Sequence, residues 1–383
     1  MEFTVFTLAM TVFWVSIFVK IISSLRKQMT SWKYFSIYPL LLLLMFCILR
    51  VIFPLELPFT TIILSKKLLP PVQRFLYTPF YSVVEIDITL FHIILGIWAI
   101  GTGVILIKQA REYLHFRHTV DLLPESNDMR LYEILDKARA GNLKEIKIKI
   151  HKSFRSPAII GFVHPVIIMP KIELNDDQLL GIFIHEVSHY KLKHHVIKLI
   201  TEIIQACFWW NPIFRTLSAE VTHALEMHSD KMVCSRLDKR QLNEYLQGIL
   251  KVMEIMKKEK HTVSCGCGLV EDDDDEKIQQ RFEMILNNGY QSKEKISFLT
   301  ILLILGVFVL SYGFVVQPYV EPTLDDIDTG AMILEGGDPC YYVKTENGYE
   351  VYDISGQYID TVESITDSFS TNLKPLEIKE DIK

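Results

Sequence analysis

The chain has 383 residues, of which 49% are hydrophobic, and a formal net charge of −6 at pH 7. This balance excludes a nucleic-acid-binding class, because phosphate recognition needs a basic face and the lysines and arginines here are scattered. We therefore expect no direct contact with nucleic acid. Six cysteines in a chain of this length also exclude a fold held together by a disulfide framework.

Four apolar stretches are long enough to cross a hydrocarbon core of about 30 Å at about 1.5 Å per residue. They cover residues 3–25, 34–55, 86–107 and 296–316. A cleavable signal peptide is the competing interpretation of the first stretch, but a basic start and a small-residue cleavage site are missing. Arg50 lies near the end of the second stretch, where we expect its side chain to reach the headgroups. The sequence therefore predicts four transmembrane helices.

The orientation of these helices follows from the lysines and arginines that flank them. Basic residues gather after the first and third stretches and before the fourth, which predicts a cytoplasmic domain over residues 108–295 and both chain ends outside. Residues 1–107 would then hold three helices, and residues 317–383 an external module. The loop between the second and third stretches disagrees with this orientation, because it carries Lys66, Lys67 and Arg74.

The domain between the third and fourth stretches is predicted to mix helices and strands. Residues 129–140 have a helical pattern, and the alternating run EIKIKIH puts Ile146, Ile148 and Ile150 on one face of a strand. Two apolar runs within residues 157–170 are separated by a turn, which is typical of a β-hairpin. The expected fold class is an α-helical membrane protein with an α+β cytoplasmic domain.

A helix that follows this hairpin carries the strongest chemical signal in the chain. Asn175 is its expected N-cap, and His185 and His189 are spaced one turn apart, so both imidazoles project from one face. Glu186 lies beside them, in the pattern HExxH. Zinc suits this set because it accepts two nitrogens and an oxygen and leaves one position for water. We predict that His185 and His189 bind Zn²⁺ and that Glu186 is catalytic.

A second acidic segment, AEVTHALEMHSDKMV, supplies the remaining candidates. Glu226 and Asp230 are four residues apart on a helix, and we predict that Glu226 is the third zinc ligand. Asp230 is predicted to accept a hydrogen bond from a ligand imidazole and to fix its tautomer. The alternative is a solvated acidic face. The histidines expected to be ordinary polar residues rather than ligands are His194, His195, His223 and His228.

Several motifs in this order resemble the BlaR/MecR type of membrane metallopeptidase, a family of bacterial antibiotic-sensing signal transducers. They are PAIIGFVHPVIIMP, HEVSHYKLKHH, FWWNP, LEMHSDKMV and EKIQQRFEMIL, and the resemblance covers roughly residues 1–316. It implies a gluzincin-like site built from His185, His189, Glu226 and Asp230. It also implies regulated proteolysis of a cytoplasmic protein such as a transcriptional repressor, with an extended substrate pairing along the edge of the hairpin at residues 157–170.

The chain departs from the antibiotic sensors after its fourth apolar stretch. Only 67 residues follow Val316, and none of them forms the SxxK motif of a penicillin-binding domain. The sequence therefore gives no support for β-lactam sensing. The runs CYYVKT and YEVYDI alternate, with turns at Asn347-Gly348 and Ser355-Gly356, and they predict a small β-rich module.

The expected function is that of a zinc metalloendopeptidase in the bacterial membrane that cleaves a cytoplasmic repressor, and potentially its own chain, in response to an external signal. A rival interpretation is a non-proteolytic sensor or scaffold with a structural zinc site, although such a site has no need of Glu186. A transporter subunit is disfavoured because only four spans are predicted. The acidic run EDDDDE at residues 271–276 indicates an exposed linker. A homodimer is one oligomeric state that the sequence leaves open.

Overall fold

The computed structural model describes residues 5–27, 37–83, 86–139, 145–161, 163–258, 275–286, 294–319, 341–345, 348–352 and 358–362. The chain divides into two units, Met1–Tyr319 and Val320–Lys383. Two of the predicted features fall partly outside the described residues. They are the linker at residues 271–276, of which 271–274 are not described, and the turns at Asn347-Gly348 and Ser355-Gly356.

Helices α1 (Val5–Lys27) and α5 (Leu90–Leu122) contain the two candidate membrane spans. By length and composition, Val5–Ser24 and Leu90–Leu122 are apolar enough to cross a bilayer. Helices α3 (Ile37–Ile52) and α12 (Glu294–Leu310) coincide with the other two predicted stretches, but their described apolar parts are shorter than a full span. The structure thus supports a membrane protein with two candidate spans.

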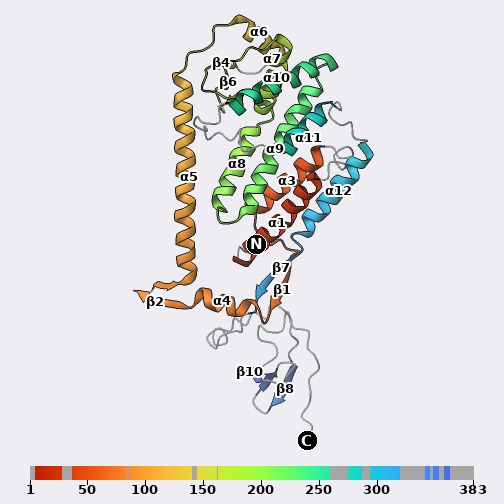
Figure 1. Ribbon diagram of the computed structural model, residues 1–383. Helices are drawn as coiled ribbons and strands as arrows, with labels where there is room; N and C mark the ends of the chain where they lie inside the picture. The colour runs from red at the N-terminus through yellow and green to blue at the C-terminus, as the bar shows by residue number, and fades with distance from the viewer. Residues whose placement is uncertain are drawn as a thin grey trace. The chain divides into compact units, whose positions relative to one another are not determined.

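The predicted third and fourth stretches have different boundaries in the structure. Residues 86–89 form strand β3 (Ile86–Thr89) and pair with β2 (Pro79–Val83), so they are not helical. Helix α5 begins at Leu90, where Thr89 and His92 form a capping box, and continues well past residue 107 (Figure 1). Helix α12 ends at Leu310. Strand β7 (Phe314–Pro318) follows it and pairs in parallel with β1 (Thr61–Ser65).

A buried apolar cluster joins α1 and α3 to α9 (Pro212–Cys234) and to α8 (His194–Cys207). At its edge Arg26 of α1 pairs with Glu220 of α9, with a distance of 3.0 Å between Nε and Oε2 and both side chains buried. The expectation that Arg50 reaches the headgroups was wrong. Its side chain is fully buried, and its guanidinium lies 3.9 Å from the centre of the Tyr312 ring.

The sheet beside α7 (Asp176–Lys191) has three strands in the order β4 (Lys147–Ile150), β6 (Val166–Met169), β5 (Ala158–Ile160). Strands β5 and β6 are antiparallel, which confirms the predicted hairpin, whereas β4 and β6 are parallel. The predicted face of the first strand was partly wrong. Ile150 is exposed and Lys149 is buried, because its ammonium donates to the carbonyl oxygens at the end of α5, those of Val120 and Asp121.

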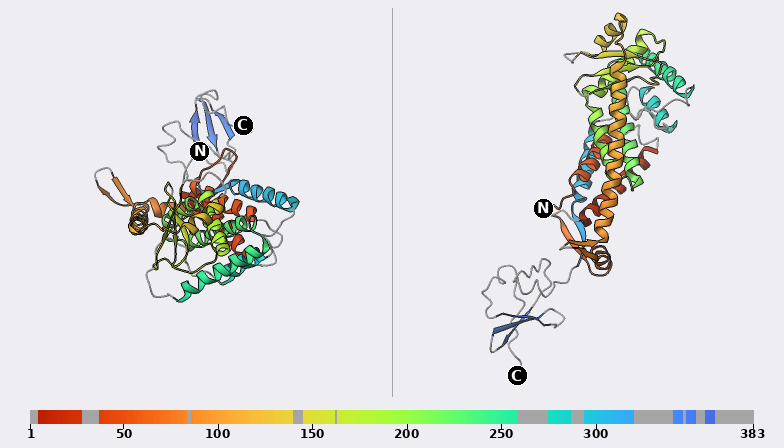
Figure 2. Two further views of the ribbon diagram at one scale, coloured as in Figure 1. Left: turned by 90° about the horizontal axis from the view of Figure 1, so that it is seen from above. Right: turned by 90° about the vertical axis from the view of Figure 1, so that its left-hand side faces the viewer.

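Helix α7 lies in the core of this region. Asn175 accepts a hydrogen bond from the Gln178 amide, so the predicted N-cap is confirmed. Its apolar residues pack against α6 (Met129–Arg139) and α10 (Lys239–Lys258). In Figure 2, α5 extends away from these helices as one long helix, and it packs against α8. Helix α4 (Leu69–Tyr77) lies between β1 and β2, and α11 (Asp275–Leu286) packs against α9 and α10.

The second unit contains a three-stranded antiparallel sheet of β8 (Tyr341–Thr345), β9 (Gly348–Tyr352) and β10 (Tyr358–Val362). The middle strand is β9. Strands β8 and β9 coincide with the two alternating runs CYYVKT and YEVYDI, and β10 lies beyond them.

At Gly181 helix α7 lies close to Tyr245 of α10, which provides a test of this packing. A Cβ added there would lie 2.6 Å from Cδ2 of Tyr245. We predict that Gly181→Ala destabilises the folded protein by about 1–3 kcal/mol, because the Tyr245 ring must move out of a packed core. Gly103→Ala is the matched control, since its Cβ would meet nothing within 4 Å. Thermal unfolding in detergent measures both, and equal melting temperatures for the two variants would contradict the prediction.

Candidate metal centre

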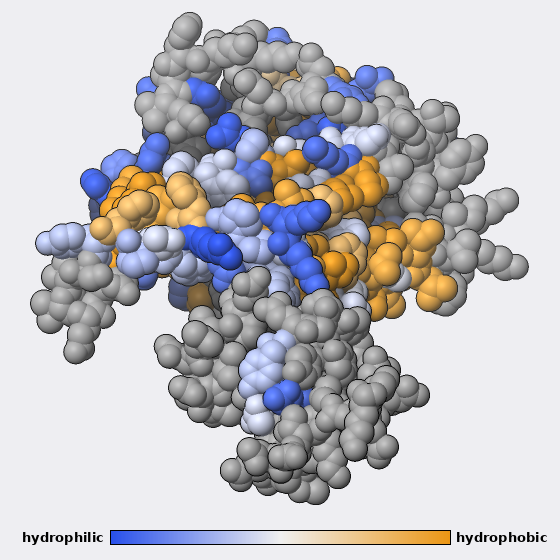
Figure 3. All heavy atoms as spheres, turned by 90° about the horizontal axis from the view of Figure 1, so that it is seen from below, coloured by the Kyte–Doolittle hydropathy of each residue, from blue (hydrophilic) through white to orange (hydrophobic). Residues whose placement is uncertain are grey.

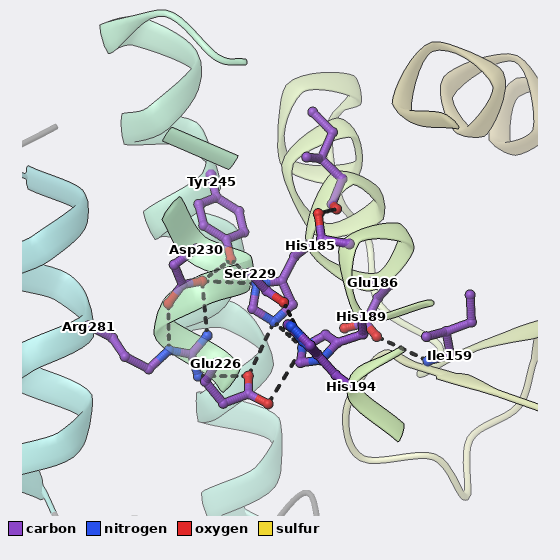
Figure 4. A network of polar contacts seen from close by, with 12 residues as sticks. Ile159, His185, Glu186, His189, His194, Glu226, Ser229, Asp230, Tyr245 and Arg281 are labelled. Carbon is purple, nitrogen blue, oxygen red and sulfur yellow. Dashed lines mark hydrogen bonds and ion pairs between the residues drawn. The ribbon is translucent and has the colours of Figure 1, made fainter. Parts of the chain in front are cut away.

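Helix α7 presents three polar side chains from within an otherwise apolar core. His185, Glu186 and His189 are all buried. One helical turn separates the two histidines, and their Nε2 atoms lie 3.1 Å apart. The predicted spacing therefore brings both imidazoles to one point, as Figure 4 shows.

Helix α9 brings Glu226 to the same point. Its Oε2 atom lies 3.2 Å from Nε2 of His185, and its Oε1 atom lies 3.5 Å from Nε2 of His189. A tetrahedral zinc ion with ligands at about 2.0–2.2 Å needs ligand atoms roughly 3.3–3.6 Å apart, so the three side chains fit such an ion. Within the described part of the chain, these residues form the one cluster of this kind.

Asp230 lies one turn beyond Glu226, and its carboxylate has no exposed surface. Its Oδ1 atom is 2.9 Å from Nδ1 of His185. When His185 donates the Nδ1 proton to this carboxylate, the lone pair on Nε2 is free to bind a metal. This is the contact that the predicted role of Asp230 requires.

The sequence prediction missed two residues that complete the surroundings of Asp230. The hydroxyl of Tyr245, on α10, donates to Asp230 at 2.7 Å and lies 2.9 Å from Nδ1 of His185. Arg281, on α11, contacts Asp230 twice, through Nε at 2.7 Å and through a terminal nitrogen at 3.2 Å. Arg281 lies within the quoted motif EKIQQRFEMIL, but no spacing rule connects that motif with the histidines.

Two cations also face Glu226. The Lys198 ammonium lies 3.2 Å from Oε1, and the Arg281 guanidinium lies 3.5 Å from Oε2. Burial alone raises the pKa of the Glu226 carboxyl, but Lys198 and His189 outweigh it and hold that pKa well below its usual range. Burial also raises the pKa of the Asp230 carboxyl, but Arg281 and His185 outweigh it and hold that pKa below its usual range. Both carboxylates are therefore ionised at neutral pH, the state in which a carboxylate binds a metal.

The ligand histidines differ in their charge environment. Burial lowers the pKa of His185, yet the adjacent Asp230 and Glu226 raise it to about 10. Burial is the main cause of the lowered pKa of His189. A metal ion that binds here must therefore displace a proton from His185.

The four histidines that were predicted to be ordinary polar residues lie outside the metal cluster, but His194 lies close to it. Its Nδ1 atom is 3.0 Å from Nδ1 of His189, and its Nε2 atom is 3.3 Å from Nδ1 of His228. His223 is bonded to Gln280 at 3.1 Å, and His195 stacks on Tyr190. His194 therefore orients a predicted ligand, a contact that the sequence analysis missed.

Glu186 points away from Glu226 and towards the sheet. Its Oε2 atom accepts a hydrogen bond of 3.0 Å from the backbone amide of Ile159, in strand β5. Because β5 lies at the edge of the sheet, this contact joins the predicted catalytic carboxylate to the open side of the hairpin.

A His-His-Glu cluster with two buried histidines, a partly buried glutamate and a further glutamate next to the first histidine defines a metallopeptidase-type centre. The comparison with known families agrees. The family described as BlaR1 peptidase M56 matches residues 4–285, and the chain belongs to this family.

Individual relatives match over shorter stretches. The regulatory protein BlaR1 of Bacillus licheniformis is 26% identical over 164 residues, which cover 42% of this chain and 27% of the relative. The methicillin resistance protein mecR1 of Staphylococcus aureus is 25% identical over 111 residues, 28% of this chain and 19% of the relative. The matched segments thus span about a quarter or less of these relatives.

Substitution of the two α9 carboxylates tests the predicted ligand set. Glu226→Ala should lower zinc affinity most, because it removes a ligand, and Asp230→Ala should lower it about 10- to 100-fold, because it frees the His185 ring. The affinity is measured by competition with a chelator. Asp136→Asn, an exposed acid on α6, is the control and should bind zinc like the wild type. Unchanged affinity in both α9 variants would show that the third ligand lies elsewhere.

Arg281 is expected to position Asp230 and Glu226. Arg281→Ala should weaken zinc binding about 10- to 100-fold, because it leaves two buried carboxylates to repel each other and removes support from the His185 ring. Arg281→Lys keeps the charge but loses the two-point contact, so we expect an intermediate affinity. Chelator competition together with circular dichroism separates this effect from unfolding. Wild-type affinity in a folded Arg281→Ala protein would rule out the positioning role.

Proposed function

We propose that this chain is a zinc metalloendopeptidase that is held in the membrane by four helices and acts in transmembrane signalling. The observation that carries the proposal is the cluster of His185, His189 and Glu226 with the buried Glu186 next to it. A structural zinc site is normally closed by four protein ligands, whereas three ligands leave a position for water. The described residues offer three.

In the proposed reaction each residue of the site has its own role. His185, His189 and Glu226 would hold a zinc ion, which when bound would polarise the substrate carbonyl and lower the pKa of water. Glu186 takes a proton from the attacking water and delivers it to the leaving amide nitrogen, so that one peptide bond is exchanged for a carboxylate and an amine. Asp230, Tyr245 and Arg281 keep the His185 ring in the orientation that this requires.

Strand β5 is the proposed guide for the substrate. It lies at the sheet edge, and the Ile159 amide points away from β6 towards Glu186. An extended peptide that adds to this edge would lie beside the metal cluster. We further propose a gluzincin-like fold for this α+β domain.

The proposed setting is a multi-pass protein of the bacterial cell membrane, with the domain over residues 108–295 in the cytoplasm and both ends outside. The basic flanks of the apolar stretches support this orientation. The matched relatives are named as a regulatory protein and a methicillin resistance protein. They motivate the proposal that a cytoplasmic transcriptional repressor, and potentially this chain itself, is cleaved when an external signal arrives.

One contact favours a second candidate, a non-proteolytic sensor in which zinc only stabilises the domain. The hydrogen bond from Ile159 gives Glu186 a structural role that does not need catalysis. The two candidates make opposite predictions for a Glu186 variant.

Glu186→Gln should bind zinc like the wild type but lose proteolysis, because the amide still accepts the Ile159 hydrogen bond but cannot carry a proton. The assay uses full-length protein in lipid vesicles with a repressor encoded beside it as substrate, and cleavage is followed by gel and N-terminal sequencing. Glu226→Ala, which should lose both zinc and cleavage, is the control. If Glu186→Gln cleaves at the wild-type rate, Glu186 is not the proton carrier. If the wild type cuts neither the repressor nor itself, the sensor is favoured.

A further inference from the structure

The hairpin of α8 and α9 carries apolar surface that the proposed reaction does not use. Its tip is Phe208–Asn211, the start of the motif FWWNP. Trp209 and Trp210 are 43% and 53% exposed at this tip, and Leu199 and Ile203 are exposed on α8. A water-facing helical hairpin seldom presents large apolar side chains together in this way.

The tip meets α5 within the apolar part of that helix. The Trp98 indole nitrogen donates to the carbonyl oxygen of Cys207 at 2.6 Å, and Trp209 packs so closely on Gly101 that an added Cβ would lie 2.8 Å from its ring. The first charged residue of α5 is Lys108, seven positions after Gly101. At about 1.5 Å per residue, the tip therefore lies roughly 10 Å deeper than that charge.

The packing of α9 on α1 indicates the same depth of the tip within the membrane. Phe214 and Leu217, next to the tip on α9, belong to one buried cluster with Val15 and Phe18. These two residues lie in the middle of the candidate span Val5–Ser24. The tip of the hairpin thus contacts α5 within its candidate span, and the adjacent part of α9 shares a buried cluster with the middle of the α1 span.

The polar groups of the hairpin agree with such a position. At membrane depth, non-helical backbone must be bonded within the protein. At the tip, the Asn211 amide donates to the Phe208 carbonyl at 2.9 Å, and the Asn211 side chain accepts from the Ile213 amide at 3.0 Å. Together with the Trp98 bond to Cys207, these contacts pair several polar groups of the turn within the protein.

The charged residues of the hairpin lie towards its open end or can reach that end. Glu220 is buried against Arg26, two residues past the end of the α1 span, which marks the level of the membrane surface. Arg215 is exposed about one turn from the tip, and its long stem can extend along the apolar surface towards the headgroups. Glu202 on α8 is half-buried within the bundle.

We propose that the α8–α9 hairpin is a re-entrant membrane element, which enters the bilayer from the side of the metal centre and returns to that side. Its exposed residues Leu199, Ile203, Trp209 and Trp210 contact lipid acyl chains. Helix α8 has 14 residues and is about 21 Å long, too short to cross a core of about 30 Å. Figure 3, the view from below, shows patches of hydrophobic side chains among hydrophilic ones on that face. The inference rests on α1 and α5 spanning the membrane and not on the proposed catalysis.

The test is spin-label accessibility in phosphatidylcholine and phosphatidylglycerol vesicles. Single cysteines are placed at Trp210 and Ile203 in a cysteine-free background, with Ile97 on α5 as lipid reference and Met129 on α6 as water reference, both exposed. Collision rates with oxygen and with a water-soluble nickel complex are compared. We expect the oxygen-to-nickel ratio at 210 to match that at 97, with an intermediate ratio at 203.

A ratio at 210 that equals the ratio at 129 would overturn the proposal. If Ile97 also has the ratio of Met129, α5 is not a span, and the membrane part of the proposed function fails as well. A conservative variant guards against misfolded labelled proteins. Trp209→Phe combined with Trp210→Phe should reduce the fraction of tryptophan fluorescence that is quenched by lipids brominated in mid-chain, and an unchanged fraction would again exclude lipid contact at the tip.

Discussion

The Asp230 carboxylate has no exposed surface, and side chains from three other helices converge on it. Burying a charge that has no partner costs on the order of several kcal/mol. The groups that pair with Asp230 must therefore be held in place. They are His185 from α7, Tyr245 from α10 and Arg281 from α11. Gly181 lets the Tyr245 ring approach α7 closely enough to reach both Asp230 and His185. The geometry of the metal cluster thus depends on one carboxylate that is not itself a predicted ligand.

Helix α11 connects the surroundings of Asp230 with the end of α1, a candidate membrane span. Arg281 contacts the site, and one position earlier the Gln280 side chain donates to the Arg26 carbonyl oxygen at the end of α1, at 3.0 Å. Gln280 also bonds to His223, on the same helix as Glu226. A displacement of α1 would therefore act on α11 and α9 together, and both helices hold groups that surround the metal cluster. Coupling between α1 and the metal cluster requires two stable arrangements of α11. The residues of α11 that would change partners are Gln280 and Arg281.

Local patterns predicted those parts of the fold that depend on neighbours in sequence. The spacing of His185 and His189, the N-cap at Asn175 and the hairpin strands follow from periodicity and capping, and the structure has each of them. The exposed position of Ile150 and the buried position of Arg50 were not predictable, because tertiary contacts with α5 and with Tyr312 decide them. Arg281 lies 51 positions after Asp230, and no local rule relates residues at such a distance.

The depth of the hairpin determines where the metal cluster lies relative to the bilayer. Glu226 follows the tip residue Asn211 by 15 positions of helix, which is roughly 22 Å along α9. In the proposed re-entrant arrangement, with the tip at the middle of a hydrocarbon core about 30 Å thick and α9 along the membrane normal, the cluster would lie about 7 Å above that core, among the lipid headgroups. The Arg26–Glu220 pair, about 9 Å nearer the tip along α9, then lies at the edge of the core. In the proposed arrangement, a substrate strand on β5, whether from a cytoplasmic repressor or from this chain, would be bound at the membrane surface.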